Sequence, residues 1–222
     1  MIVDLNLKGK HAVVVGGGTE GMRKVRGLLG QGCRITVISN RISSYLSEQA
    51  ALGKIQVVKA SLRSAAILDK YPSAFLVLAA TNDKSLNRKL VEKGRAMGAF
   101  VYAADDPPVS DFSYASIINI EGVVQVAIST SGKSPIMARK IRMRAEKVLV
   151  KLIKRVDVDN ARLQEFARNA ARPAIKTVDE RKRFLYSIIN DRGIQNLIKA
   201  EKIEDAKLAT LELLQKWEKK TK

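Results

Sequence analysis

Apolar positions in residues 1–113 fall into short runs that alternate with segments of helical spacing. Five runs have the composition of buried strands: Ala12–Val15, Arg34–Ile38, Ile55–Val58, Ala74–Ala80 and Phe100–Ala103. The segments that follow the first four of them have the spacing of helices: Met22–Leu29, Ser43–Ala51, Ser64–Lys70 and Ser85–Met97. Because strands that alternate with helices pair in parallel through right-handed crossovers, we predict an α/β fold with a doubly wound parallel sheet.

The pattern changes after Pro107. Tyr114–Ile120 and Val123–Ser129 read as two strands joined by a turn, and a helix is predicted over Pro135–Arg155 with Ser134 as its cap. One stripe of this helix carries the apolar residues Met137, Ile141, Ala145, Val148, Leu149 and Leu152. Two strands and one helix leave apolar surface bare, so we expect a homodimer.

The remaining chain reads as helical. We predict helices over Asn160–Ala171, Asp179–Asp191, Gly193–Ala200 and Glu204–Lys219, with Pro173 and Gly193 as breaks. The expected organisation is therefore a nucleotide-binding domain (residues 1–113), a small α+β dimerisation region (114–155) and a C-terminal helical domain (156–222).

A glycine-rich turn follows the first strand and opens the first helix. It satisfies G-x-G-x-x-G at Gly16, Gly18 and Gly21. Gly16 permits the tight turn, Gly18 lets a pyrophosphate approach bare backbone, and Gly21 lets helix and strand pack closely. The free N–H groups at the helix start face the anion. This context predicts a dinucleotide site.

The sequence leaves the choice of dinucleotide open. NAD specificity often shows as an acidic residue at the end of the second strand, where this chain has Ser39, Asn40 and Arg41. Ser39 or Asn40 could bond a ribose 2′-hydroxyl, whereas Arg41 could pair with a 2′-phosphate.

Charge is the unusual feature of the composition. The chain has 40 Lys and Arg against 22 Asp and Glu, a net charge of +18. Residues 133–155 alone hold 9 basic residues and 1 acidic residue. Nucleic acid, an anionic membrane or a polyanionic small molecule would each suit such a surface, and so would simple lysine enrichment of a thermophilic or salt-adapted protein.

Other features of the sequence narrow the class. Cys33 is the single cysteine, which excludes an internal disulfide and a cysteine metal cluster. We expect it to fill a small apolar space. Since the sequence shows neither a membrane-length apolar run nor a signal peptide, we expect a cytoplasmic protein.

Several stretches together strongly resemble the siroheme-synthase N-terminal module, the family of precorrin-2 dehydrogenases, some of which are also sirohydrochlorin ferrochelatases. The resemblance covers about residues 3–150 and is carried by VVVGGGTEGMRKVRGLL, by LAATND with Asn87 downstream, by VYAADDPPVSDF and by ISTSGKSPIMARKIR. It implies a homodimer with a Rossmann-type domain that passes a hydride from precorrin-2 to NAD⁺. Precorrin-2 is a polycarboxylate, which would account for the excess of positive charge.

The resemblance also implies roles for particular residues. Asp105 matches the active-site aspartate and would take a proton from the macrocycle, although the residues alone also suit an Asp-Asp-Pro turn, the role we give Asp106. The cofactor-binding residues are expected to be Gly16, Gly18, Thr19, Glu20, Gly21, Ser39, Asn40, Thr81, Asn82 and Asp83. The substrate-binding residues are expected to be Thr130, Ser131, Lys133, Ser134, Arg139 and Arg142; capped turns and solvated side chains are the alternative for most of them.

Two other functions compete with the dehydrogenase. One is a bifunctional enzyme that also inserts Fe²⁺; His11, the single histidine, begins the first strand away from the crevice, so such an enzyme would work without histidine ligands. We expect no resident metal. The other is a non-catalytic nucleotide sensor whose basic tail binds nucleic acid, which we disfavour because no aromatic-basic interleaving occurs. We also expect no methyltransferase domain after residue 222.

Overall fold

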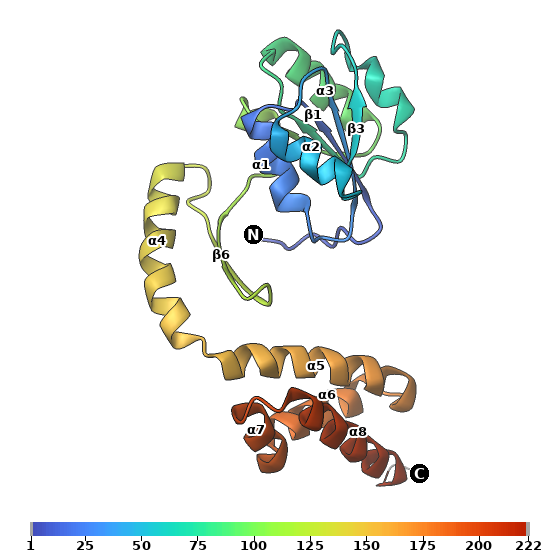
Figure 1. Cartoon of the computed structure of the whole chain (residues 1–222), viewed down its shortest axis with the longest axis vertical. Coiled ribbons are helices and arrows are strands. Elements are labelled where there is room, and N and C mark those ends of the chain that lie inside the picture. Colours follow the sequence, from blue (N-terminus) through green and yellow to red (C-terminus); the bar gives the residue numbers. More distant parts are fainter. Residues whose placement is uncertain (1, 221–222) are drawn as a thin grey trace. The chain divides into compact units, whose positions relative to one another are not determined.

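The computed structural model describes residues 2–220, which divide into two compact units between Tyr114 and Ala115 (Figure 1). The first unit contains a five-stranded sheet, and the second contains a hairpin and helices. The predicted further division between residues 155 and 156 stays a prediction.

The sheet of the first unit is parallel throughout and confirms the predicted doubly wound fold. Its strands lie in the order β3-β2-β1-β4-β5. Their bounds are β1 His11–Val15, β2 Arg34–Ser39, β3 Gln56–Lys59, β4 Leu76–Ala79 and β5 Phe100–Ala103. The connecting elements are α1 Thr19–Leu28, α2 Ser44–Ala51, α3 Lys84–Ala96 and the 3₁₀ turns η1 Ala65–Lys70 and η2 Pro107–Val109.

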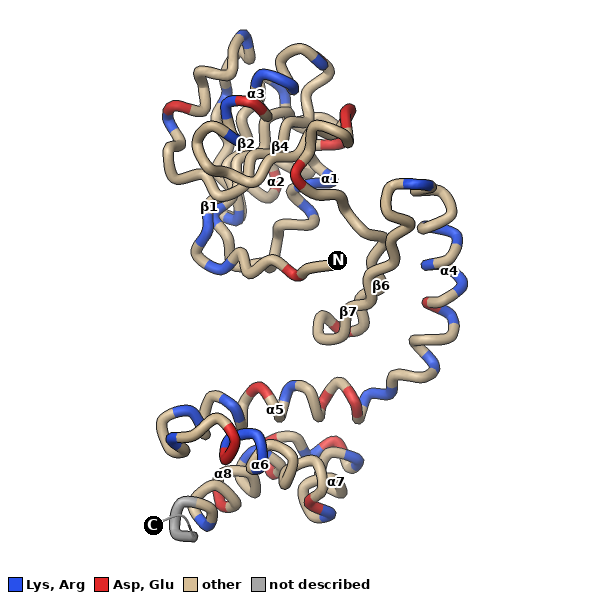
Figure 2. The backbone as a smooth tube through the Cα atoms, turned by 180° about the vertical axis from the view of Figure 1, so that it is seen from behind, with Lys and Arg blue, Asp and Glu red and all other residues tan. Residues whose placement is uncertain are grey.

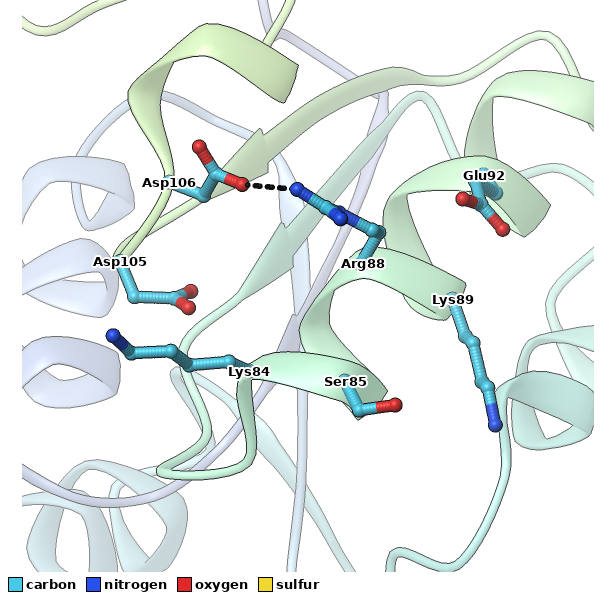
Figure 3. Close-up of a pocket in the computed structure, with 7 residues that line it drawn as sticks. All are labelled: Lys84, Ser85, Arg88, Lys89, Glu92, Asp105 and Asp106. Carbon is cyan, nitrogen blue, oxygen red and sulfur yellow. Dashed lines mark hydrogen bonds and ion pairs between the residues drawn. The ribbon is translucent and has the colours of Figure 1, made fainter.

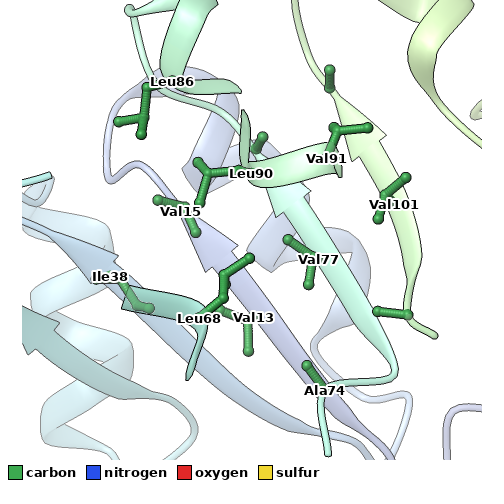
Figure 4. Close-up of a cluster of buried hydrophobic side chains, with 13 residues drawn as sticks. Val13, Val15, Ile38, Leu68, Ala74, Val77, Leu86, Leu90, Val91 and Val101 are labelled. Carbon is green, nitrogen blue, oxygen red and sulfur yellow. The ribbon is translucent and has the colours of Figure 1, made fainter. Parts of the chain in front are cut away.

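Both faces of this sheet are covered, which explains why its strands are apolar without alternation. On one face Val13, Val15 and Val77 pack beneath Leu86 and Leu90 of α3 (Figure 4). On the other face the alternate residues pack against α1 and α2: Val14, Val37 and Leu78 meet Val25, Leu28 and Leu46. The two helix layers hold the carboxyl ends of the strands, and the loops that leave them, in fixed positions.

The outer edge of β5 is closed by side chains rather than by another strand. The N–H of Val101 donates to Asp111 Oδ2 at 3.0 Å, and the N–H of Ala103 donates to Ser110 Oγ at 3.0 Å. The backbone N–H of Asp111 returns a bond to the Val101 carbonyl at 2.9 Å, and Arg95 of α3 pairs with the same carboxylate at 2.7 Å. Residues 110–111 therefore act as a short substitute for a neighbouring strand.

His11, at the start of β1, has a structural role. Its ring is buried, with Nε2 2.9 Å from Thr36 Oγ1, and Arg34 Nη2 donates to Nδ1 at 3.0 Å. Burial, and secondarily the Arg34 charge, lower the pKa of His11. Cys33 is half-buried, and burial raises the pKa of its thiol.

The second unit begins with an antiparallel hairpin, β6 Ser116–Ile120 and β7 Val124–Ile128. Glu121 and Gly122 turn the chain at φ of 50° and 73°, as the sequence predicts. Helix α4, Pro135–Leu152, lies against the hairpin, where Ala145 and Leu149 pack on Ile118 and Ile120. Ser134 caps this helix by accepting from the Met137 N–H at 3.2 Å.

The junction of two helices near residue 153 differs from the prediction. The helix predicted over Pro135–Arg155 ends at Leu152, because Ile153 leaves the helix and packs with the hairpin core. A new helix starts at Arg155, where Asp157 Oδ2 accepts from the Lys154 N–H at 2.8 Å.

The C-terminal helices share a single core. They are α5 Arg155–Ala174, α6 Val178–Asn190, α7 Arg192–Lys199 and α8 Ile203–Lys220. Pro173 lies inside the last turn of α5 rather than after it, and Gly193 is the second residue of α7, so neither acts as the expected break. Leu163, Phe184 and Ile188 are fully buried at the centre of the four helices.

The apolar stripe predicted on α4 is only partly buried. Ala145 and Leu149 meet the hairpin, and Ala138 is buried as well, but Met137, Ile141, Val148 and Leu152 are exposed. Figure 2 shows Lys and Arg along the whole length of this helix. None of the helices within residues 2–220 is long and apolar enough to cross a membrane.

Candidate functional site

A crevice of about 610 Å³ opens where the loops after β1, β2 and β4 meet. Its walls are the glycine turn with Thr19 and Met22, the segment Ser39–Ser43, Leu62, and Ala80–Asp83 with Leu86. These are the carboxyl ends of adjacent parallel strands, where ligands bind in open α/β sheets. The crevice thus brings together most of the predicted cofactor residues; Glu20 and Gly21 are not among its lining residues.

The three glycines of the G-x-G-x-x-G turn have different steric surroundings. Gly16 has φ of 117°, and a Cβ there would collide with the Ala80 carbonyl. A Cβ at Gly21 would collide with the Gly16 carbonyl oxygen, so this glycine sets the contact between α1 and β1. A Cβ at Gly18 would meet nothing within 4 Å, which leaves bare backbone facing open space.

The start of α1 is shaped for an anion. Gly18 is its N-cap and supplies no side-chain hydrogen bond, so the first-turn amides need another acceptor. A pyrophosphate fits this position, because it brings acceptor oxygens and negative charge to the positive end of the helix. Glu20 lies on the exposed side of α1 and pairs with Arg23 at 2.6 Å.

The loop after β2 forms the second wall of the crevice. Ser39 is buried, and its hydroxyl donates to the Arg41 carbonyl at 2.6 Å. Its proton is therefore already used by the turn, whereas Asn40 and Arg41 are exposed at the crevice. A ribose would meet the side chains of Asn40 and Arg41 first.

The third wall is the loop between β4 and α3. Asp83 caps α3 by accepting from the Leu86 N–H at 3.0 Å, and Asn82 lines the crevice. Thr81 is bonded to Asn87 at three points: Asn87 Oδ1 accepts from the Thr81 N–H at 3.1 Å and from its hydroxyl at 2.6 Å, and Asn87 Nδ2 donates to the Thr81 carbonyl at 3.0 Å.

A second pocket, of about 620 Å³, lies on the other side of the start of α3. It is lined by Lys84, Ser85, Arg88, Lys89, Glu92, Asp105 and Asp106 (Figure 3). Asp105 follows β5, is exposed, and accepts from Asn87 Nδ2 at 2.6 Å. Asp106 pairs with Arg88 at 3.0 Å, and Figure 3 shows the Lys84 side chain extending toward Asp105. Asp105 therefore stands at a pocket beside the crevice and is joined through Asn87 to Thr81 in the crevice wall.

The predicted substrate residues belong to the second unit. Thr130 and Ser134 close a turn on each other, since the Thr130 hydroxyl accepts from the Ser134 N–H and donates to the Ser134 carbonyl, both at 3.0 Å. Ser131, Lys133 and Arg139 are exposed. Arg142 is half-buried and pairs with Glu146 at 2.6 Å.

Two aromatic rings that are not predicted to meet Lys24 of α1 lie against its side chain. Its ammonium lies 4.0 Å from the centre of the Tyr102 ring and 3.8 Å from that of Tyr114, and only 7% of the residue is exposed. Burial lowers the pKa of Lys24 to about 8, and burial raises the pKa of both tyrosines. The cluster fixes the last residues of the first unit.

Sequence reasoning assigned no function to Asn87, Lys84 or Arg88. Asn87 had a signal, because it is a polar residue beside Leu86 and Leu90 on the buried face of a predicted helix. Lys84 and Arg88 had none, since exposed basic residues occur along the whole chain. Within residues 2–220, no group of three or more His, Cys, Asp or Glu is arranged to hold a metal ion.

Family comparisons agree with this geometry. A family model described as "Putative NAD(P)-binding" matches residues 3–116, and one described as "Sirohaem biosynthesis protein central" matches residues 122–144. The first of these covers the sheet, the glycine corner and Asp105.

Known proteins extend the likeness along the chain. The siroheme synthase of Neisseria meningitidis serogroup C is 33% identical over 187 residues, which are 84% of this chain and 37% of that protein. The siroheme synthase of Nitrosococcus oceani is 39% identical over 145 residues, 65% of this chain and 30% of that protein. The chain thus spans well under half the length of these curated relatives.

A solved structure named "SirC, precorrin-2 dehydrogenase" superposes with a TM-score of 0.63 at 24% identity, covering 99% of both chains. It shows that the fold is shared over the whole chain.

Proposed function

This chain belongs to the putative NAD(P)-binding family, and we propose that it oxidises precorrin-2 to sirohydrochlorin with NAD⁺. In this reaction a hydride and a proton leave the macrocycle, and NAD⁺ supplies the hydride acceptor. The names of the similar siroheme synthases and of the similar precorrin-2 dehydrogenase support the substrate.

The crevice fits a nicotinamide dinucleotide. The first-turn amides of α1 would bind the pyrophosphate, and Asn40 would meet the adenosine ribose. A dinucleotide bound in this way would extend toward Thr81, Asn82 and Asp83, the residues that separate the crevice from the second pocket.

Asp105 is the group that would take the proton. The observation that carries the proposal is its place: it stands at the second pocket and is joined through Asn87 to Thr81 of the crevice. A carboxylate so placed can remove a proton from a ligand in the second pocket as hydride leaves toward the crevice.

The positive residues of the second unit would bind the carboxylates of the macrocycle. Lys133 and Arg139 are exposed and supply charge without an ion-pair partner among the described residues. Thr130, Ser131 and Ser134 form the turn that starts α4, which suits a carboxylate, and Arg142 lies two turns further along that helix.

Turnover tests this function. Purified protein given precorrin-2 and NAD⁺ should produce NADH absorbance and the sirohydrochlorin spectrum; a parallel series with NADP⁺ decides the nucleotide. Loss of a general base costs about 10²–10⁴-fold, so Asp105→Asn should lower kcat by at least about tenfold. Asp69→Asn, the same change at an exposed carboxylate on η1, should leave kcat unchanged. Absence of turnover with both nucleotides would refute the function.

The same preparation addresses the competing functions. Sirohydrochlorin and Fe²⁺, mixed with the protein under exclusion of air, measure metal insertion against the spontaneous rate. Labelled DNA and RNA measure nucleic-acid binding, which we propose is absent at physiological salt.

We also propose that the exposed face of α4 pairs with a second copy of the chain. Met137, Ile141, Val148 and Leu152 lie on one stripe of the helix and are 42%, 36%, 64% and 68% exposed. Continuous exposed apolar surface of this kind marks association. Val148→Glu should shift the protein from dimer to monomer in sedimentation experiments, whereas Lys147→Glu, at the neighbouring exposed position, should not. A wild-type monomer at micromolar concentration would contradict the proposal.

A further inference from the structure

Asn87 is a buried amide at the junction of the two pockets. It lies in the first turns of α3 with 1% of its surface exposed, between the apolar residues that pack this helix on the sheet. A buried polar side chain costs stability unless its hydrogen bonds are made. At Asn87 all of them are made, and none goes to another part of α3.

The hydrogen-bond pattern fixes the orientation of the amide. Oδ1 receives two donors, the N–H and the hydroxyl of Thr81, and Nδ2 faces two acceptors, the Thr81 carbonyl and Asp105 Oδ1. The flipped amide would set its oxygen against a carbonyl and a carboxylate, and its NH₂ against an N–H. Only one orientation is therefore compatible with the site.

The contact with Asp105 holds one oxygen of that carboxylate. At 2.6 Å it is a short, charge-assisted bond, which defines the direction of Oδ1 and leaves Oδ2 for another partner. Asp106, next in the chain, is held differently, by the guanidinium of Arg88 at 3.0 Å. Of the two adjacent carboxylates, Asp105 alone is joined to the wall of the dinucleotide crevice.

We propose that Asn87 is a positioning residue: it aims the free oxygen of Asp105 at the substrate and keeps that oxygen in register with the Thr81 loop, where the hydride acceptor lies. This inference rests on the proposed dehydrogenase function. It assigns to Asn87 an action through Asp105, which differs from a role in stability alone.

A double-mutant cycle separates the two roles. Asn87→Asp keeps the shape and the acceptor of Asn87 but removes both donated bonds. With Asp105 in place it should lower kcat for precorrin-2 oxidation about tenfold or more, and change KM for NAD⁺ by less than about threefold. In the Asp105→Ala background it should change kcat by less than about twofold, because the residue through which it acts is gone.

The controls make each outcome decisive. Asn169→Asp, the same change at an exposed position of α5, should leave kcat unchanged. Asn87→Ser, which is neutral and leaves room for water, goes through the same cycle and decides the matter where Asn87→Asp does not fold. Absence of turnover by the wild-type chain refutes the proposed function itself. Wild-type turnover with equal losses in both backgrounds, or with unchanged kcat, overturns the role of Asn87 alone.

Discussion

Two glycines of α1 offer a matched test of how the dinucleotide corner is built. Gly21 and Gly27 lie in the same helix, and the same change to alanine has opposite steric consequences. A Cβ at Gly27 would meet nothing within 4 Å and the residue is exposed. A Cβ at Gly21 would come far closer than 3.0 Å to the Gly16 carbonyl, a backbone atom that cannot rotate away.

The expected magnitudes follow from these surroundings. Gly27→Ala should stabilise the first unit by about 0.5–1 kcal/mol, because alanine loses less backbone entropy than glycine in a helix. Gly21→Ala makes the same gain but adds an overpacking cost of about 1–3 kcal/mol, so the two variants should differ by about that amount. Since α1 must move away from Gly16, its first-turn amides move too, and Kd for NAD⁺ should rise by about tenfold or more, equivalent to about 1.4 kcal/mol.

Urea denaturation followed by far-ultraviolet circular dichroism measures the stability difference, and calorimetric titration measures Kd for NAD⁺. Trp217, the single tryptophan, lies in α8, so its fluorescence follows the second unit and should give the same midpoint in both variants. Equal stability of the two variants, together with unchanged NAD⁺ affinity, would refute the steric account of Gly21.

Two further predictions concern charged groups outside the crevice. The pKa of Lys24 falls from 10.5 to about 8 on folding, so between those values the unfolded chain binds a proton that the native chain lacks, and stability should rise with pH by at most about 1.4 kcal/mol per unit. Above about pH 10 the raised pKa values of Tyr102 and Tyr114 make stability fall with pH, because the tyrosines of the unfolded chain ionise first. Urea titrations at a series of pH values should show no rise in stability between about pH 8 and 10 for Lys24→Met. A rise identical to that of the wild type would contradict the assignment to Lys24. Asp159 is 6% exposed and accepts hydrogen bonds from Arg155 at 2.9 Å and from Arg162 at 3.0 Å. Asp159→Ala should therefore lower the free energy of unfolding of the second unit by about 1–3 kcal/mol, measured by denaturation followed through Trp217 fluorescence. Glu165→Gln, a change at an exposed position of the same helix, should lower it by less than about 0.5 kcal/mol.

The sequence was most informative where one local rule decides the structure. Strands buried on both faces, the glycine spacing and the Ser134–Pro135 helix start each predict an element, and the sheet confirms the doubly wound fold. The start of α5 could not be found in this way, because residues on both sides of Ile153 have helical spacing. The break there depends on burial of Ile153 against a hairpin distant in sequence.

The site was predictable in its parts more than in its connections. The loops that follow β1, β2, β4 and β5 are all expected to face one crevice; the first three line it, whereas Asp105 and Asp106 after β5 line the second pocket. The hydrogen bonds from Asn87 to Thr81 and Asp105 could not be predicted from the sequence, because they depend on where the start of α3 lies relative to the ends of β4 and β5. The stripe on α4 is predictable, but the division within it is not, because periodicity alone does not say that Ala145 and Leu149 meet the hairpin while Val148 stays exposed.

The manner in which Ser110 and Asp111 satisfy β5 has a practical consequence for dissecting the chain. A fragment that stopped at Val109 would keep every strand and helix of the nucleotide-binding unit, yet would present the N–H groups of Val101 and Ala103 to solvent. An edge strand with unpaired backbone N–H groups can pair with a strand of another molecule, so such a fragment should self-associate and precipitate. Expression of this unit by itself should therefore extend at least through Tyr114.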